Sequence, residues 1–293
     1  VNVKAIKKSL FELVQRNENL RSTFRICEDG VPRVCECDSR VLAEELFKEE
    51  LATVESAANR AHDIFSTEFD LAKGPLIRCR MLRISGKDDE MHLVIILHHL
   101  VSDGFSFVLF HDQLSALYNA AWAGKPFPPQ RDLCTYHDAV EWERRSQVSV
   151  FRKSVSFWKK NLEGAKVWPM PSMKLPHPIC RSNTTQRFKI SAEIVSGLQV
   201  AAKHTHSTLF NVVSSAYHVL LAHFLGGDDS IVVSPWFNRP HTDVDDVLGC
   251  FVNLLALRAS VTGDPSFEEL VLRGKRAMAE ALENPIPASW IVR

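Results

Sequence analysis

Short apolar runs alternate along this chain with longer stretches in which apolar residues recur every three or four positions. Residues 3–17 carry Ile6, Leu10, Leu13 and Val14 at helical spacing, which predicts an amphipathic helix. The same periodicity predicts helices at 43–65, 105–123, 136–162, 191–204, 208–225 and 266–283. Short runs bounded by turn residues predict strands at 20–26, 32–37, 76–84, 91–97, 185–190 and 230–235. The pattern therefore indicates an α/β fold with strands and helices in both halves.

Residues 167–183 break this pattern and mark the expected domain boundary. They are rich in proline and show little periodicity, as linkers between compact units do. We therefore expect an N-terminal lobe over 1–166, a proline-rich linker over 167–183, and a C-terminal lobe over 184–293.

The composition excludes several classes of function. The 293 residues carry a formal net charge of zero, and their Lys and Arg residues are mixed with acidic ones, which disfavours nucleic-acid binding. The sequence contains no apolar run long enough to span a membrane, no phosphate loop, no dinucleotide-binding glycine fingerprint and no metal-ligand cluster. The seven cysteines are odd in number and scattered, so we expect reduced thiols in a cytoplasmic protein.

The strongest candidate for chemistry is the histidine pair that follows the apolar run 91–97. Imidazole titrates near neutral pH, so His99 at this strand end can exchange a proton with a substrate. Adjacent strand residues face opposite sides, and we therefore expect His98 to pack inward. The same His-x-x-x-Asp spacing recurs at 241–245 in a polar loop, whereas the strand before and the helix after favour His99. The alternative is that His99 is only a hydrogen-bonded structural residue at the end of the strand.

Five segments, in order, resemble the motifs of condensation domains from nonribosomal peptide synthetases. They are 16–24, 98–104, 136–142, 237–240 and 249–258. The segment 98–104 has the family's His-His-x-x-x-Asp-Gly pattern, and 249–258 is similar to its Gly-x-Phe-Val-Asn-Thr-x-x-x-Arg pattern. Two departures stand out: Asn17 occupies a position where the family has histidine, and 136–142 lacks one aromatic residue of its motif.

The resemblance implies two chloramphenicol-acetyltransferase-like lobes that form a V with a central tunnel. It also implies truncation at both ends, because the family's opening strand is missing and 283–289 keeps little of the final motif. Such domains join an acyl donor to an amine acceptor. The implied substrates are the phosphopantetheine arms of donor and acceptor peptidyl carrier domains, with no bound cofactor. Adjacent adenylation or ketosynthase modules are the implied neighbours.

The resemblance also assigns roles around the histidine pair. His99 would accept a proton from the attacking amine or stabilise the tetrahedral intermediate. Gly104 would let its amide approach the thioester, although a glycine that only makes the turn is an equal alternative. Asp103 would form a buried ion pair that fixes the loop, with Arg21 as its candidate partner and His98 as further structural support.

Two further residues are candidates for the tunnel wall. Asn253 would hydrogen-bond the phosphopantetheine arm, and Tyr136 would line the tunnel. Both have plain structural alternatives, because a buried amide needs hydrogen-bond partners and an aromatic residue on a helix commonly packs against its neighbours.

Three rival functions stay open at this point. A free-standing acyltransferase of the same superfamily would move an acyl group from coenzyme A or a carrier thioester to a small alcohol or amine. An epimerisation domain usually continues with Ser-Trp after the glycine, whereas this chain continues with Phe-Ser-Phe at 105–107. A non-catalytic remnant would bind carriers or have no activity.

Overall fold

The chain forms two compact units, and each is described by itself. The computed structural model describes residues 1–293 except 88, 131–133, 166–184, 240, 288–289 and 291–293. Unit 1 comprises Val1–Arg145 and Phe237–Val252, and unit 2 comprises Ser146–Trp236 and Asn253–Arg293.

The boundary between the units differs from the expected one. It falls between Arg145 and Ser146, inside the helix α5 (Tyr136–Asn161), instead of after residue 166. The physical reason is that one long helix supplies residues to both units, so a helical pattern hides the boundary. The proline-rich linker expected at 167–183 lies outside the described residues.

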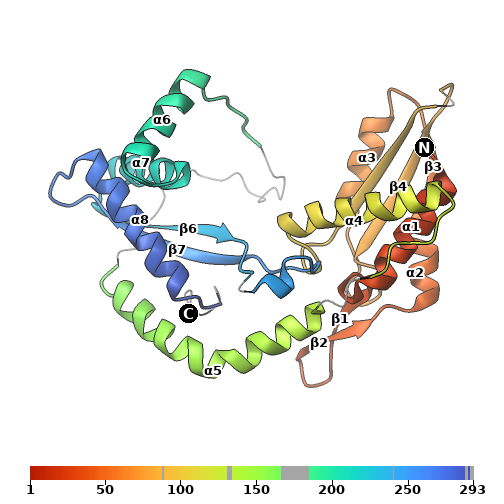
Figure 1. The fold of residues 1–293 in the computed structure, drawn as a ribbon, viewed down its shortest axis with the longest axis horizontal. Coiled ribbons are helices and arrows are strands. Elements are labelled where there is room, and N and C mark those ends of the chain that lie inside the picture. The colour runs from red at the N-terminus through yellow and green to blue at the C-terminus, as the bar shows by residue number, and fades with distance from the viewer. Residues whose placement is uncertain (88, 131–133, 166–184, 240, 288–289, 291–293) are drawn as a thin grey trace, which may run out of the picture. The chain divides into compact units, whose positions relative to one another are not determined.

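Unit 1 combines a mixed sheet with helices and a separate hairpin (Figure 1). Its elements are α1 (Val3–Arg16), η1 (Glu18–Arg21), β1 (Ser22–Ile26), β2 (Pro32–Glu36), α2 (Ser39–Glu45), β3 (Phe47–Ala52), α3 (Ala57–Ser66), β4 (Ile77–Ile84), β5 (Met91–Leu97), α4 (Gly104–Trp122), the start of α5, and η2 (Thr242–Val244). The sheet order is β3-β4-β5, with β3 parallel and β5 antiparallel to β4. β1 and β2 pair antiparallel.

The core of unit 1 lies where α1, α4 and the sheet meet. Leu10, Leu13 and Val14 of α1 are fully buried, as their helical spacing predicted, and Phe110 of α4 packs into the same cluster. The side chain of Asn2 begins α1 by accepting a hydrogen bond from the Ala5 amide. Periodicity therefore located the helices that support the end of β5.

The helix predicted over 43–65 is wrong in its first half, where the chain forms β3. The ends of this strand, Phe47 and Ala52, are buried, while Lys48 to Glu50 are polar and imitate a solvated helix. Glu49 pairs with Arg83 at 2.7 Å on the neighbouring strand. Because these cross-strand partners lie far along the sequence, local periodicity gave no sign of them.

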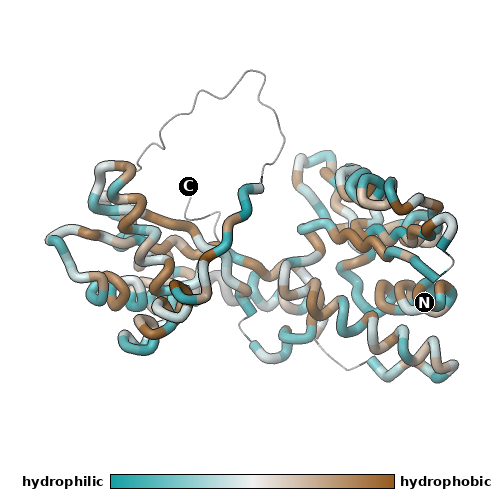
Figure 2. Tube along the Cα trace, turned by 90° about the horizontal axis from the view of Figure 1, so that it is seen from above, coloured by the Kyte–Doolittle hydropathy of each residue, from teal (hydrophilic) through white to brown (hydrophobic). Residues whose placement is uncertain are grey.

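Unit 2 is an antiparallel strand pair with helices (Figure 1). Its elements are the second part of α5, α6 (Ala192–His204), α7 (Leu209–Leu225), β6 (Asp229–Trp236), β7 (Asn253–Ser260) and α8 (Phe267–Glu283). β6 and β7 pair in a register that sets Ile231 opposite Arg258. Figure 2 shows hydrophobic and hydrophilic positions alternating along the traces of both units, as amphipathic elements require.

The strand predicted at 185–190 is wrong, because this stretch has no regular structure. Phe188 is 81% exposed there, so the apolar residues that suggested a strand have no sheet to pack against. Among the described residues, no single helix is long and apolar enough to cross a membrane, and only α6 and α7 together, bent by 105°, meet that test of length and composition.

The connection between β6 and β7 positions the candidate site. The chain leaves unit 2 after Trp236, contributes Phe237–Val252 to unit 1, and returns to unit 2 at Asn253. We call Phe237–Val252 the inserted loop. Its last residues, 249–252, begin the motif at 249–258, so unit 1 contains this first part of the motif together with the histidine pair.

Candidate active site

His98 and His99 follow β5 directly and have different surroundings. The His98 amide donates to the Leu76 carbonyl at 2.9 Å, which extends the strand pairing by one residue. The His98 ring is half-buried, stands edge-on to Phe69, and accepts a hydrogen bond from the Leu100 amide through Nδ1. Burial lowers the pKa of His98, and the neighbouring His99 acts in the same direction. His98 therefore contacts Phe69 and the turn after β5, and its role as support of the site stays a prediction.

His99 is exposed, as a residue that meets a substrate must be. Its Nδ1 atom lies 3.6 Å from the Sγ atom of Cys250 in the inserted loop. This contact was not foreseen, because nothing in the sequence links a residue at the end of β5 to one so far along the chain. His99 thus presents its ring to solvent with a thiol at one nitrogen.

Asp103 is buried and holds two segments together. One carboxylate oxygen accepts a hydrogen bond from the Ser106 amide at 2.7 Å and so begins α4. The other accepts from the Phe251 amide at 2.9 Å and the Val252 amide at 3.2 Å. Three backbone donors thus satisfy a carboxylate whose side chain is 1% exposed. The expected supporting role fits this geometry.

The expected ion-pair partner of Asp103, Arg21, is wrong. Arg21 donates to the carbonyls of Val14 and Gln15 and pairs with Glu36 at 3.1 Å, because it lies beside the end of α1 and the β1–β2 hairpin. The arginine near Asp103 is Arg239 of the inserted loop, with 4.0 Å between Nη2 and Oδ1.

Arg239 is enclosed by the inserted loop and α4. Its guanidinium lies over the rings of Phe105 and Phe251, 4.7 and 4.2 Å from their centroids, and it donates to the carbonyls of Val244 and Val247. Burial lowers the pKa of Arg239, and the charge of Asp103 opposes that shift. The weak match at 237–240 was the one sequence signal that pointed to this residue.

Ser106 and Gly249 join α4 to the inserted loop. The Ser106 hydroxyl donates to the Gly249 carbonyl at 2.5 Å and accepts from the Gly249 amide at 3.0 Å. A Cβ atom on Gly249 would lie 2.2 Å from the ring of Tyr136, so a side chain does not fit there. Sequence reasoning missed the role of Ser106, because this residue lies just beyond the His-His-x-x-x-Asp-Gly motif at 98–104 and is not part of it.

Tyr136 supports the same loop from the other side. Its hydroxyl donates to the Cys250 carbonyl at 3.0 Å, and its ring stands edge-on to Phe251. Burial raises the pKa of Tyr136 to about 12. These contacts match the packing alternative for Tyr136, and its role in a tunnel wall stays a prediction.

Gly104 begins α4 beside this cluster. It lacks a positive φ angle, and an added Cβ atom would meet no atom within 4 Å. Neither backbone strain nor neighbouring atoms of the described residues therefore require glycine, and both interpretations of Gly104 stay predictions. The open space over the first turn of a helix is a place where a developing negative charge is favoured.

Asn253 lies in unit 2, whereas the histidine pair lies in unit 1. Its amide nitrogen donates to the Ile286 carbonyl at 2.8 Å, and its oxygen accepts from the Leu254 amide. Within unit 2 this side chain therefore has the structural contacts of the alternative interpretation, and contact with a phosphopantetheine arm stays a prediction.

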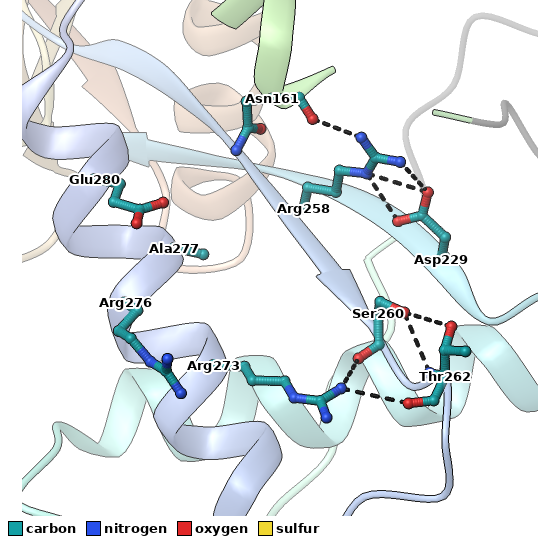
Figure 3. A pocket seen from close by; sticks show the side chains of 9 residues that line it. All are labelled: Asn161, Asp229, Arg258, Ser260, Thr262, Arg273, Arg276, Ala277 and Glu280. Carbon is teal, nitrogen blue, oxygen red and sulfur yellow. Dashed lines mark hydrogen bonds and ion pairs between the residues drawn. The ribbon is translucent and has the colours of Figure 1, made fainter. Parts of the chain in front are cut away.

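The arginine that closes the 249–258 motif also has a structural place. Arg258 forms a forked pair with Asp229, with the shortest distance 2.7 Å, and donates to the Asn161 carbonyl (Figure 3). It also donates to the Glu163 carbonyl. The hydrogen bonds that Arg258 donates to the Asp229 carboxylate raise the pKa of Arg258. Both side chains line a cavity of about 540 Å³ in unit 2. In the described part of the chain, no three His, Cys, Asp or Glu side chains gather as metal ligands.

Known proteins with similar sequences are large synthetases. The chain is 29% identical over 290 residues to chondramide synthase cmdD from Chondromyces crocatus, covering 97% of this chain and 7% of that protein. It is 29% identical over 300 residues to surfactin synthase subunit 1 from Bacillus subtilis, covering 100% of this chain and 8% of that protein. The chain thus spans a small part of each of these relatives.

Solved structures and a family model complete the comparison. A complex of the X-domain and OxyB from teicoplanin biosynthesis has the same fold, with a TM-score of 0.84 and 24% identity over 99% of this chain and 65% of the matched chain. The model of the condensation domain matches residues 1–293. Taken with the histidine motif and the inserted loop that supports it, this match shows that the chain belongs to the condensation domain family of nonribosomal peptide synthetases.

Proposed function

We propose that unit 1 carries the reacting site of a domain that forms amide bonds between two carrier-tethered substrates. The observation that supports this proposal best is the contrast between His99, which is exposed at the end of β5, and the fully bonded Asp103 four residues later. The buried contacts of Asp103 hold the loop in place, and the imidazole of His99 stays accessible to a substrate.

The reaction is a transfer from sulfur to nitrogen. The amine nitrogen of the acceptor bonds to the thioester carbonyl carbon of the donor, the carbon–sulfur bond breaks, and the amine's proton ends on the departing thiol. Negative charge develops on the carbonyl oxygen, so a hydrogen-bond donor at that oxygen lowers the barrier. His99 can serve either as the base or as such a donor, and Gly104 leaves room over the start of α4.

The substrates and partners follow from the family. We expect donor and acceptor peptidyl carrier domains to present phosphopantetheine arms, with adenylation or ketosynthase modules as neighbours, and no bound cofactor. The V-shaped pair of lobes and the tunnel are part of the same proposal. A reducing, cytoplasmic location is supported by the free cysteines at the described positions, Cys27, Cys35, Cys37, Cys79, Cys134 and Cys250.

The test is a condensation assay with aminoacyl donor and acceptor carrier proteins, using the chain and a version extended at both ends by its native sequence. We expect His99→Ala to abolish product. His92→Ala is the matched control, because His92 is an exposed histidine on β5, the strand that precedes His99, and its ring contacts Glu90. Full condensation by the folded His99→Ala variant would refute the assignment.

Gly104 supplies a second variant in the same assay. We expect Gly104→Ala to fold like the wild type, because the added methyl group meets no atom within 4 Å, and to lose most of its condensation rate by occupying the approach to α4. Acyl transfer from coenzyme A to a free alcohol or amine, with no carrier required, would instead support the acyltransferase alternative.

A further inference from the structure

Cys250 is the one side chain for which the structure gives a hydrogen bond to the His99 ring, within the described residues. Its Sγ atom lies 3.6 Å from Nδ1 of His99, which is hydrogen-bond distance for sulfur. In the motif pattern this position accepts varied residues, so the thiol is a property of this chain and not of the pattern.

The backbone around Cys250 is fixed on both sides. Ser106 makes two hydrogen bonds to Gly249, and the carboxylate of Asp103 accepts from the amides of Phe251 and Val252. The Tyr136 hydroxyl donates to the carbonyl of Cys250 itself. The fold therefore sets the position of the Cys250 backbone, and the contact of its side chain with His99 does not depend on a free loop.

The protonation of the thiol decides which atom donates. Burial is the main cause that raises the pKa of Cys250, the charge of Asp103 adds to it, and the Val252 amide acts in the opposite direction. At neutral pH the sulfur therefore keeps its proton. A neutral thiol has one proton to donate and a weakly accepting sulfur, whereas an unprotonated imidazole nitrogen is a good acceptor.

We propose that Cys250 is a positioning residue that donates its thiol proton to Nδ1 of His99 and so keeps the imidazole proton on Nε2. This inference rests on the proposed function. With this tautomer His99 acts as a hydrogen-bond donor and not as a base. Its Nε2–H hydrogen-bonds the carbonyl oxygen of the thioester as that oxygen becomes negative. The amine's proton then passes to the departing thiolate sulfur without residing on His99.

The first test is nuclear magnetic resonance of the full chain with ¹⁵N-labelled histidine at neutral pH. We expect the wild type to show a protonated Nε2 and an unprotonated Nδ1 for His99, with His99→Gln identifying these signals. Cys250→Ala is expected to give a mixture of tautomers, and Cys250→Ser, whose hydroxyl can also donate, to restore the single one. Cys27→Ala, in the β1–β2 turn, is the control. A proton on Nδ1 in the wild type would overturn the proposal.

The second test is kinetic and separates this inference from the proposed function. In the condensation assay, loss of one hydrogen bond is expected to lower kcat about fivefold in Cys250→Ala, with KM unchanged and with rescue by Cys250→Ser. If His99→Ala abolishes condensation while Cys250→Ala leaves both the rate and the tautomer unchanged, the positioning role alone is refuted. If His99→Ala keeps the wild-type rate, the proposed function is refuted whatever the tautomer.

Discussion

Each unit contains an arginine–aspartate pair, and the two pairs stabilise their units in different ways. In unit 2, Arg258 and Asp229 approach to 2.7 Å, with side chains 25% and 18% exposed. In unit 1, Arg239 and Asp103 are 4.0 Å apart, with side chains 6% and 1% exposed. The closer pair, Arg258–Asp229, is a direct, forked ion pair that solvent partly reaches. The buried pair is looser, because backbone amides already satisfy its carboxylate. The pair next to the candidate site therefore differs from the other in its burial and its hydrogen bonds to the backbone, and not in a shorter distance between the charges.

Removing the buried carboxylate should have the largest effect. Asp103→Ala deletes the acceptor for three backbone amides and leaves the guanidinium of Arg239 buried without its counter-charge. We expect a loss of about 3–5 kcal/mol in the free energy of unfolding, measured by urea denaturation at neutral pH. A variant as stable as the wild type would show that the buried pair contributes nothing.

A methyl group on Gly249 tests whether the inserted loop is held as tightly as the pair suggests. The new Cβ would lie 2.2 Å from the Tyr136 ring, so the ring or the loop must move. Gly249→Ala should cost about 1–3 kcal/mol in the same denaturation experiment. Gly197→Ala in α6 is the control, because nothing lies within 4 Å of its added Cβ and alanine favours a helix.

Removing the half-buried carboxylate of Asp229 should cost less than removing the buried one of Asp103. In Asp229→Ala, solvent reaches Arg258, which also keeps its hydrogen bonds to the Asn161 and Glu163 carbonyls. We expect a loss of about 1 kcal/mol, and a smaller one in high salt. A cost equal to that of Asp103→Ala would break the distinction between the two pairs.

A buried histidine near the Arg258–Asp229 pair gives an effect that depends on pH. Burial lowers the pKa of His218, the charge of Asp229 opposes this shift, and the ring shares a 2.7 Å hydrogen bond with Ser230. Because the folded pKa is below the ordinary value of about 6.5, the stabilisation is complete above that pH and is lost as the pH falls through it. The free energy of unfolding of the wild type should fall from pH 7.5 to 5.5, by at most about 1.4 kcal/mol per pH unit from this group. The free energy of unfolding of His218→Gln should fall less over the same pH range.

The sequence predicted long, strongly periodic elements well and contacts across the chain poorly. α1 and α4 lie within one or two residues of their expected ranges, because an apolar face sets both ends of an amphipathic helix. β3 was missed because its charged residues pair with a later strand. Arg239 was missed because only the path of the inserted loop brings it to Asp103, and local pattern contains no information about that path.

The path of the inserted loop limits how this protein can be divided or recombined. A gene fragment ending at residue 166 would encode His99, Asp103 and most of unit 1, yet it would lack Phe237–Val252. On the ribosome, the site would stay incomplete until the chain had been synthesised through residue 252. An exchange of halves between two related synthetases, made at any single point between residues 146 and 236, would therefore pair the histidines of one parent with the supporting loop of the other.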